Sequence, residues 1–150
     1  MSKKRILVAC PVVPFTSGGA ERLVDDLVVA LLERNFVAEK YSIPFLVPNI
    51  SSLASQISIW RAAELHTRVG SVCDLVICTK FPSYFIKHGN KVVWMIHQFR
   101  QLYELYGTRF GEPGGEVETD IVRQMLFQAD FKALNECQKR YAISDNVAKR

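Results

Sequence analysis

Two adjacent glycines stand where the chain changes from a strand pattern to a helix pattern. The segment PVVPFTSGGAER, residues 11–22, follows the apolar run 6–10 and precedes a stretch with apolar residues at helical spacing. Gly18 and Gly19 at the start of a helix would leave N–H groups exposed and let an anion approach the backbone closely, at the positive end of the helix dipole. Both glycines are therefore candidate substrate-binding residues, with a plain turn capped by Ser17 as the alternative.

The spacing of these glycines does not match the common nucleotide-binding loops. It is neither Gly-x-Gly-x-x-Gly nor a phosphate loop that ends in Gly-Lys-Ser or Gly-Lys-Thr. Dinucleotide and nucleoside-triphosphate binding therefore lack their main sequence support. Glu21 follows in the first helical turn and is a further candidate to face a ligand, although an acidic residue there also suits the helix dipole by itself.

Three more candidates follow two later apolar runs. Lys80 comes directly after the run 74–79 and His97 directly after 91–96, with Arg100 close behind. A histidine can bond to hydroxyl or phosphate oxygens, and an arginine can hold an anion through two parallel bonds. We expect His97 to be the catalytic residue and Lys80 and Arg100 to bind substrate. The alternatives are an imidazole satisfied by a nearby carbonyl group and two solvated cations.

Apolar runs alternate with helical patterns along the whole chain. This order predicts an α/β fold, a Rossmann-like parallel sheet with helices on both faces. Ligands bind such sheets beyond the carboxyl ends of the strands, so the first loop, Lys80 and His97 should meet on one rim. The expected strands are 6–10, 37–43, 74–79, 91–96 and 141–143. The expected helices begin at 19, 51 or 52, 102, 119 and 145, and the second of them should include His66. We also expect a short helical turn at 82–87, His88 in a turn and a glycine-rich loop at 107–116.

The composition is that of one ordinary globular domain, which we place at residues 1–150. Hydrophobic residues make up 49% and charged residues 23%, so most of the chain should fold around a core. The formal charge of +4 is too small to indicate nucleic-acid binding, but it leaves contact with an anionic membrane surface open. The four cysteines lack metal-binding spacing and predict reduced, mostly buried thiols in a cytoplasmic protein.

The N-terminus resembles a signal peptide only in part. A basic start, residues 2–5, precedes a mostly apolar segment, 6–15, but two prolines interrupt that segment and no clean cleavage site follows. A basic start before a first buried strand is the preferred interpretation. No apolar stretch approaches the roughly 20 residues of a membrane-spanning helix. We therefore expect a cytoplasmic protein, at most peripheral to the inner face of the membrane.

Three segments resemble the N-terminal domain of family 4 glycosyltransferases, which are retaining, nucleotide-sugar-dependent enzymes of the GT-B fold. SGGAER follows the first strand, and TKFPSYFIKHGNKVVWMIHQFRQLYEL runs from Thr79 to Leu105, with its most specific part at 92–100. YAISDNVAKR is similar to the last strand and following helix of that domain. The resemblance covers the chain in order.

The resemblance implies an enzyme with a cleft between two Rossmann-like halves, of which this chain would be the acceptor-binding N-terminal half. The loop with Gly18 and Gly19 would approach the diphosphate and the transferred sugar, and His97 would contact the donor sugar. The partners would be a nucleotide-sugar donor and a sugar or lipid-linked acceptor, in polysaccharide or glycolipid biosynthesis. The nucleotide-binding C-terminal half is absent from this sequence, so we expect little activity from the chain alone.

The sequence has no Asp-x-Asp motif and no cluster of carboxylates after a strand. We therefore expect no metal site and no cofactor besides the donor, because amides and cations can also stabilise a departing diphosphate. This fits the family that the chain resembles.

Two other classes of protein compete with this interpretation. A receiver-like signalling domain requires acidic residues after the first strand and an aspartate after the third, but Pro11 and Thr79 stand there. A non-catalytic module that docks on membranes or proteins remains the alternative. Its surface would be basic and aromatic, with five aromatic residues that could equally be core: Phe81, Tyr84, Phe85, Phe99 and Tyr103.

Overall fold

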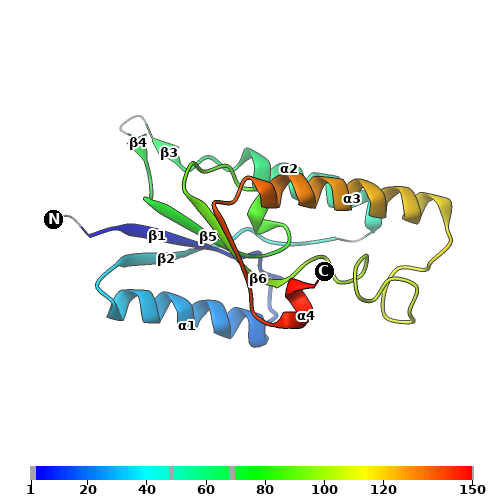
Figure 1. The fold of residues 1–150 in the computed structure, drawn as a ribbon, viewed down its shortest axis with the longest axis horizontal. Helices are drawn as coiled ribbons and strands as arrows, with labels where there is room; N and C mark the ends of the chain where they lie inside the picture. Colours follow the sequence, from blue (N-terminus) through cyan, green and yellow to red (C-terminus); the bar gives the residue numbers. More distant parts are fainter. Residues whose placement is uncertain (1–2, 48, 68–69, 150) are drawn as a thin grey trace.

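The chain forms an open, five-stranded parallel sheet with helices on both faces (Figure 1). The computed structural model describes residues 3–47, 49–67 and 70–149. The strand order is β2-β1-β5-β6-β7, and every neighbouring pair runs parallel. The predicted α/β class with a Rossmann-like parallel sheet is therefore confirmed.

The elements alternate along the chain as the apolar pattern predicts. The sheet strands are β1 (Arg5–Ala9), β2 (Val37–Tyr41), β5 (Leu75–Lys80), β6 (Lys91–His97) and β7 (Lys139–Ala142). The helices are α1 (Gly19–Glu33), α2 (Leu53–Ala62), α3 (Val117–Asn135) and α4 (Asp145–Ala148), with single 3-10 turns η1 (Ile50–Ser52) and η2 (Ser83–Phe85). A small antiparallel hairpin joins β3 (His66–Thr67) to β4 (Gly70–Ser71). Each expected sheet strand is present and begins within two residues of the predicted position.

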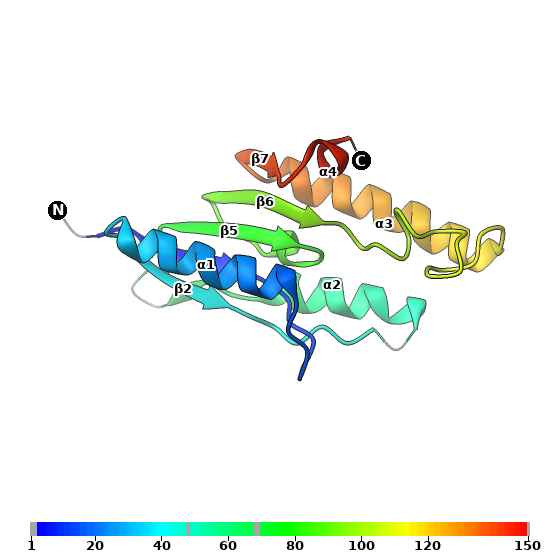
Figure 2. The same ribbon diagram turned by 90° about the horizontal axis from the view of Figure 1, so that it is seen from below.

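Two apolar cores lie on the two faces of the sheet. Helix α1 covers one face, and α2 and α3 cover the other (Figure 2). On the α1 side, Val8 of the interior strand β1 packs with Val24 of the helix. The larger core lies under α2 and α3 and contains Trp60, Tyr84 and Leu102, all 0% exposed. The four cysteines are buried and free, as predicted.

Residues 102–106 do not form the expected helix but a series of turns. The amide of Leu105 donates to the carbonyl oxygen of Arg100 at 2.9 Å, which is not the bond spacing of an α-helix. So short a segment makes too few bonds to offset the cost of nucleating a helix. Gly107, at φ 72°, then turns the chain away, and its amide donates to Glu112.

Two other expectations for helix positions are wrong. His66 lies in β3 rather than in a helix, because α2 ends when the backbone of Ala63 leaves the helical region at ψ 117°. Met125, whose helical spacing with Ala129 and Ala133 predicts the inner face of α3, is 64% exposed. Helix α3 instead turns Leu126 and Ala133 inward, with 3% and 2% of their surface exposed.

Buried Lys91 fixes the loop after β5 and the end of α3 to the sheet. Its Nζ donates to the carbonyl oxygens of Tyr84 and Ile86 at 2.8 and 3.0 Å, and to Glu136 Oε2 at 3.1 Å. Arg61 donates to the same carboxylate. The bond from Arg61, followed by the bond from Lys91, lowers the pKa of Glu136 to about 2 against the opposing effect of burial.

A second buried charge, Asp130 of α3, lies in the larger core with incomplete pairing. Only 2% of this residue is exposed. The hydroxyl of Tyr103 donates to its Oδ2 at 2.6 Å, and the Tyr84 hydroxyl lies near the carboxylate without closing a hydrogen bond. Among the described residues, Oδ1 therefore accepts no bond. Burial raises the pKa of Asp130 to about 7, although the neighbouring hydroxyls oppose that shift.

Asp130→Asn should stabilise the protein at pH 8. The folded state holds the Asp130 proton more tightly than the unfolded chain, so its contribution to stability falls as pH rises from about 4 through 7. Asparagine removes the buried charge, accepts from Tyr103 and can donate to Tyr84. The gain should reach about 4 kcal/mol at pH 8 and shrink to less than half of that near pH 5.

Urea unfolding of the wild type and Asp130→Asn at both pH values measures this difference. Asp26→Asn, at an exposed position on α1, is the control for removal of one surface carboxylate. Equal stabilities of wild type and Asp130→Asn at pH 8 would show that the carboxylate is adequately solvated or paired in the fold.

Candidate functional site

A change of register at the ends of β5 and β6 places Lys80 beside His97. Cys78 pairs with Val93, so a regular ladder would set Lys80 opposite a residue two positions before His97. The observed partner is His97 itself, and the amide of Phe81 donates to the His97 carbonyl oxygen at 3.3 Å. Such irregularities at strand ends re-aim side chains. Here the shift brings two predicted site residues together on the rim.

The Lys80 ammonium group binds the carboxylate of Glu21, in the first turn of α1. The distance from Nζ to Oε1 is 2.5 Å, and the two side chains are only 10% and 17% exposed. Glu21 Oε2 also accepts from the Gly18 amide at 3.0 Å. Burial opposes the charged form of Glu21, but the bonds from Lys80 and from nearby amides outweigh it and lower the pKa. Three of the predicted residues thus form one bonded group.

The two glycines have different surroundings. The Gly18 amide is already bonded to Glu21, so an anion would have to displace that carboxylate to use it. Among the described residues, none accepts a hydrogen bond from the amides of Gly19 or Ala20. A Cβ built on Gly19 would meet no other atom within 4 Å. The open part of the helix start is therefore at Gly19.

His97 is fixed in one tautomer at the end of β6. Its Nδ1 lies 2.8 Å from the carbonyl oxygen of Gln98. Because a carbonyl oxygen can only accept, Nδ1 carries the proton and Nε2 of the neutral ring is an acceptor. Burial lowers the pKa of His97, and the charges of Lys80 and Arg100 add to that effect against the bond to Gln98. A mostly neutral imidazole at pH 7 can therefore accept from a ligand hydroxyl at Nε2.

Lys80, His97 and Arg100 line one cavity of about 250 Å³ at the rim. Its other walls are largely apolar and include Phe45 and Phe99. Arg100 is bonded through Nε to Glu104 and keeps 53% of its side-chain surface exposed. Typical small-molecule sites measure about 300–1,000 Å³, so this cavity would hold one sugar or phosphate group rather than a whole nucleotide-sugar.

Sequence reasoning missed Ser83, which fixes the turn after β5. Ser83 is 0% exposed, and its Oγ accepts from the Thr79 amide at 3.1 Å and donates to the Lys80 carbonyl oxygen at 2.7 Å. The sequence feature that could have identified Ser83 is its position as a lone serine within the apolar segment FPSYFI. Without these bonds, the backbone that carries Lys80 would lose its support.

Gln98 was also missed, although it lies in the segment with the strongest family resemblance. It lines the rim cavity and is 7% exposed. Its Oε1 has no hydrogen-bond partner within residues 3–47, 49–67 and 70–149. A buried side-chain oxygen without a hydrogen-bond partner is uncommon in folded proteins and calls for an explanation.

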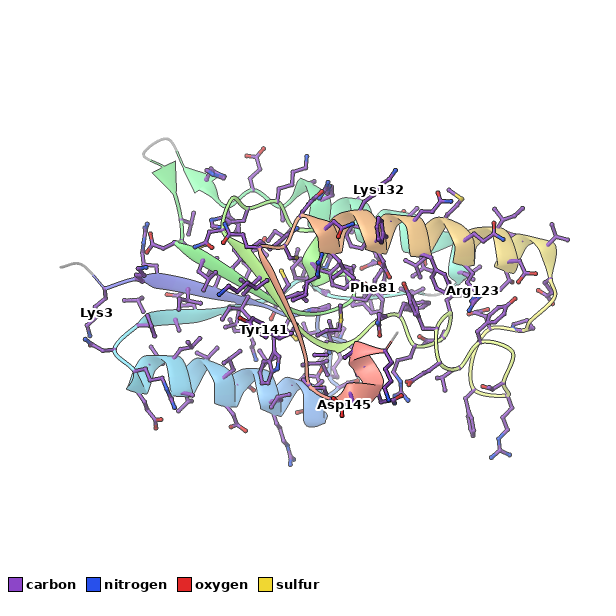
Figure 3. All side chains as sticks on the ribbon, in the orientation of Figure 1. Lys3, Phe81, Arg123, Lys132, Tyr141 and Asp145 are labelled. Carbon is purple, nitrogen blue, oxygen red and sulfur yellow. The ribbon has the colours of Figure 1, made fainter. Side chains whose placement is uncertain are left out.

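The aromatic docking surface of the alternative interpretation is not formed. Phe81, Tyr84, Phe85 and Phe99 are each at most 6% exposed, and Tyr103 is half-buried. Figure 3 shows Phe81 between the sheet and the helices above it. Its ring packs edge to face with that of Phe85, with centroids 6.0 Å apart. These residues are mainly core, so the named aromatic residues do not form an exposed surface.

The described ranges contain neither a membrane-spanning helix nor a cluster of metal-ligand side chains. No helix there is long and apolar enough to cross a bilayer. No three His, Cys, Asp or Glu side chains there are grouped as metal ligands. Neither result identifies a cofactor, so metal-independent chemistry stays a prediction.

The fold and rim define an α/β domain with an open parallel sheet and polar groups at the carboxyl ends of its strands. Comparison with known proteins found no matching family model, no matching curated protein and no matching solved structure. The rim geometry and the sequence resemblance therefore carry the functional proposal.

Lys80→Met should raise the pKa of His97, because it removes a cation that disfavours the imidazolium form. Burial, the largest cause of the depression, stays in place, so the pKa should remain below the usual value. Imidazole proton shifts followed by NMR against pH measure this change.

Lys87→Met is the matched control, because Lys87 is an exposed lysine that does not line the rim cavity. His66 and His88 serve as internal references in the same spectra. An unchanged His97 midpoint in Lys80→Met would mean that the ammonium group does not act on the imidazole.

Proposed function

We propose that this chain is the acceptor-side half of a retaining, nucleotide-sugar-dependent glycosyltransferase in polysaccharide or glycolipid biosynthesis. The observation that carries the proposal is that Lys80 lies beside His97 at one rim cavity and is bonded there to Glu21 at the start of α1, which does not itself line the cavity. The sequence resemblance, most specific at residues 92–100, is the reason for proposing glycosyl transfer as the reaction at this polar rim. Such a protein would work in the cytoplasm, at most peripheral to the membrane.

The groups at the rim are best suited to stabilise the negative charge of the leaving group. Glycosyl transfer develops positive charge on the sugar ring, as in related hydrolases, while negative charge grows on the departing diphosphate. The free amides of Gly19 and Ala20, at the positive end of α1, are suited to a phosphate oxygen. Arg100 offers a partly exposed cation on the cavity wall. These groups stabilise charge without a metal step.

His97 would orient the transferred sugar rather than donate a proton to it. Its Nδ1 proton is engaged by the Gln98 carbonyl group, so neutral His97 presents an acceptor at Nε2. A sugar hydroxyl donates to such a nitrogen. Lys80 and Arg100 help to keep the ring neutral near pH 7. The orientation of the sugar would then be lost when the imidazole is removed or protonated.

The size of the cavity supports a division of labour between two halves. About 250 Å³ is room for the sugar or its adjoining phosphate, and the loop lacks the glycine spacing of nucleotide-binding motifs. The nucleotide would then be held by protein outside this sequence. Isolated, the chain would bind a sugar phosphate weakly and gain little from an attached nucleotide.

Titration of the chain with sugar 1-phosphates and with the matching UDP-sugars tests the proposal. Glucose, galactose and mannose 1-phosphates are the probes, followed by ¹H–¹⁵N NMR. We expect weak binding by at least one, with shifts at Gly19, Ala20 and His97, and similar affinity for its UDP-sugar. Binding of the UDP-sugar more than about tenfold tighter, or about 1.4 kcal/mol, would place a nucleotide site on this chain and contradict the half-site.

Gly19→Val should weaken sugar phosphate binding about fivefold, the equivalent of about 1 kcal/mol for an anion at a helix start. Its side chain would fill the approach to the free amides, and the open space around Gly19 should let the fold tolerate it. Gly89→Val is the matched control, since a Cβ there also meets no atom within 4 Å and Gly89 lies outside the rim. Unchanged affinity in a folded Gly19→Val protein would remove the glycine loop from the site.

A further inference from the structure

A second cavity lies between the turns after β6 and the long helix α3. It measures about 490 Å³ and lies beside the rim cavity, since Gln98 lines both. Its volume is within the roughly 300–1,000 Å³ of small-molecule sites. The residues that give it its chemistry are Gln98, Tyr103, Arg123, Phe127, Asp130 and Phe131.

Two buried oxygen acceptors without partners belong to this cavity. Asp130 is 2% exposed and Gln98 is 7% exposed. Asp130 Oδ1 and Gln98 Oε1 accept no hydrogen bond from the described part of the chain. An unpaired buried acceptor destabilises the folded state. Both residues line the same hollow, although the two oxygens are covered by protein and the Tyr84 hydroxyl lies near Asp130, so a bound molecule would reach them only after the side chains turn toward the cavity.

One side of the cavity is aromatic. Phe127 stacks on Tyr103, with ring centroids 4.4 Å apart. Phe131 is 69% exposed, an unusual position for a large aromatic ring on a helix that otherwise packs on the core. These rings offer an apolar surface to a ligand that is itself partly apolar.

Arg123 provides the only cation among the described residues that line this cavity. Its guanidinium carbon lies 4.4 Å from the ring centroid of Tyr106 and 4.5 Å from that of Phe127. Its Nε donates to the Leu102 carbonyl oxygen at 2.8 Å. Figure 3 shows Arg123 on the side of α3 that faces these turns. The guanidinium plane is thus fixed by the protein before any ligand arrives.

The combination of groups restricts the chemistry of a ligand. An anion would meet the carboxylates of Asp130 and Glu104, and a cation would meet Arg123. A purely apolar molecule would leave both acceptors unpaired. A neutral ring with several hydroxyl donors and an apolar face satisfies the acceptors and the aromatic side together, and a pyranose sugar has that chemistry.

We propose that the cavity between residues 98–106 and α3 is a binding site for a neutral pyranose. Hydroxyl groups of the sugar donate to Asp130 Oδ1 and Gln98 Oε1, and one face of the ring lies against Phe127 and Phe131. This inference does not rest on the proposed function, because it requires neither a nucleotide nor a transfer step. If both hold, Gln98 joins a donor-side cavity to a cavity that receives the second sugar.

The test uses the whole chain and three uncharged probes: methyl α-D-glucopyranoside, methyl α-D-mannopyranoside and methyl β-D-galactopyranoside. Each is titrated to about 50 mM, which covers millimolar affinities, and followed by ¹H–¹⁵N NMR and saturation transfer. We expect at least one to bind, with shifts at Arg123, Phe127 and Phe131. Cyclohexanol, a ring without the set of hydroxyl groups, should not bind.

Phe131→Ala should weaken binding of the active glycoside about fivefold by removing the aromatic surface. Phe110→Ala is the matched control, because Phe110 is 66% exposed and does not line this cavity. Gln98→Leu removes one acceptor and should weaken binding at least about threefold. If Gln98→Leu does not fold, the exposed Phe131 position still decides the question.

Three results with the glycosides themselves would overturn the inference. They are no binding of any of the three glycosides, binding that Phe131→Ala leaves unchanged, and shifts confined to Lys80 and His97 at the rim. Guanosine and uridine are included because a base can also pair with acceptors and stack, and their binding in place of the glycosides would also overturn it. Sugar phosphate binding and its Gly19→Val control report on the rim alone, so either site can fail without the other.

Discussion

The register shift between β5 and β6 is the constraint on which the rim depends. With the pairing that Cys78 and Val93 begin, Lys80 would not lie beside His97. The shift extends β6 along the rim, and the bonds of Ser83 hold the turn that follows Lys80. Because parallel strands deliver their carboxyl ends to the same edge, a change of two residues in one ladder decides which side chains share a cavity.

The rim is also preorganised by its own charges. Glu21 bonds both to the Gly18 amide and to Lys80, so it fixes the start of α1 relative to the end of β5. The same pairing neutralises Lys80, which leaves the helix start at Gly19 and the partly exposed Arg100 as the attraction for an anion. A phosphate therefore meets a site of modest charge. We therefore expect weak phosphate binding at this rim, because strong affinity needs further contacts.

Much of the fold was predictable because it rests on local pattern. The run 6–9 is apolar at every position and lies in the interior strand β1, and the periodicity after Gly19 gives helix α1. Placement of Lys80 and His97 at strand ends followed from the same pattern. The turns at 102–106 were misjudged as a helix, because nothing in their composition shows that Gly107 reverses the chain there.

Relations between distant residues were not readable from one sequence. Glu21 and Lys80 are 59 positions apart, and either could have been a solvated surface charge. Asp130 reads as one more polar residue on an amphipathic helix, whereas the fold buries it beneath Tyr103. The tautomer of His97 depends on the path of the backbone at Gln98. Such contacts arise from tertiary packing, and local secondary-structure propensity does not predict them.

Asp130 is the residue whose position is hardest to explain by stability alone. Its burial raises its pKa to about 7, which means that the fold is weakened at neutral pH by a group that an apolar or amide side chain could replace. The contrast with Lys91 is direct, because that buried cation has three acceptors within 3.1 Å. A charge fully paired inside the protein fixes the fold, whereas one with an unpaired oxygen at a cavity suits a molecule from outside. Strain of this kind is commonly retained where binding requires it, and the incomplete pairing of Asp130 is the cost in stability that the proposed sugar site would explain.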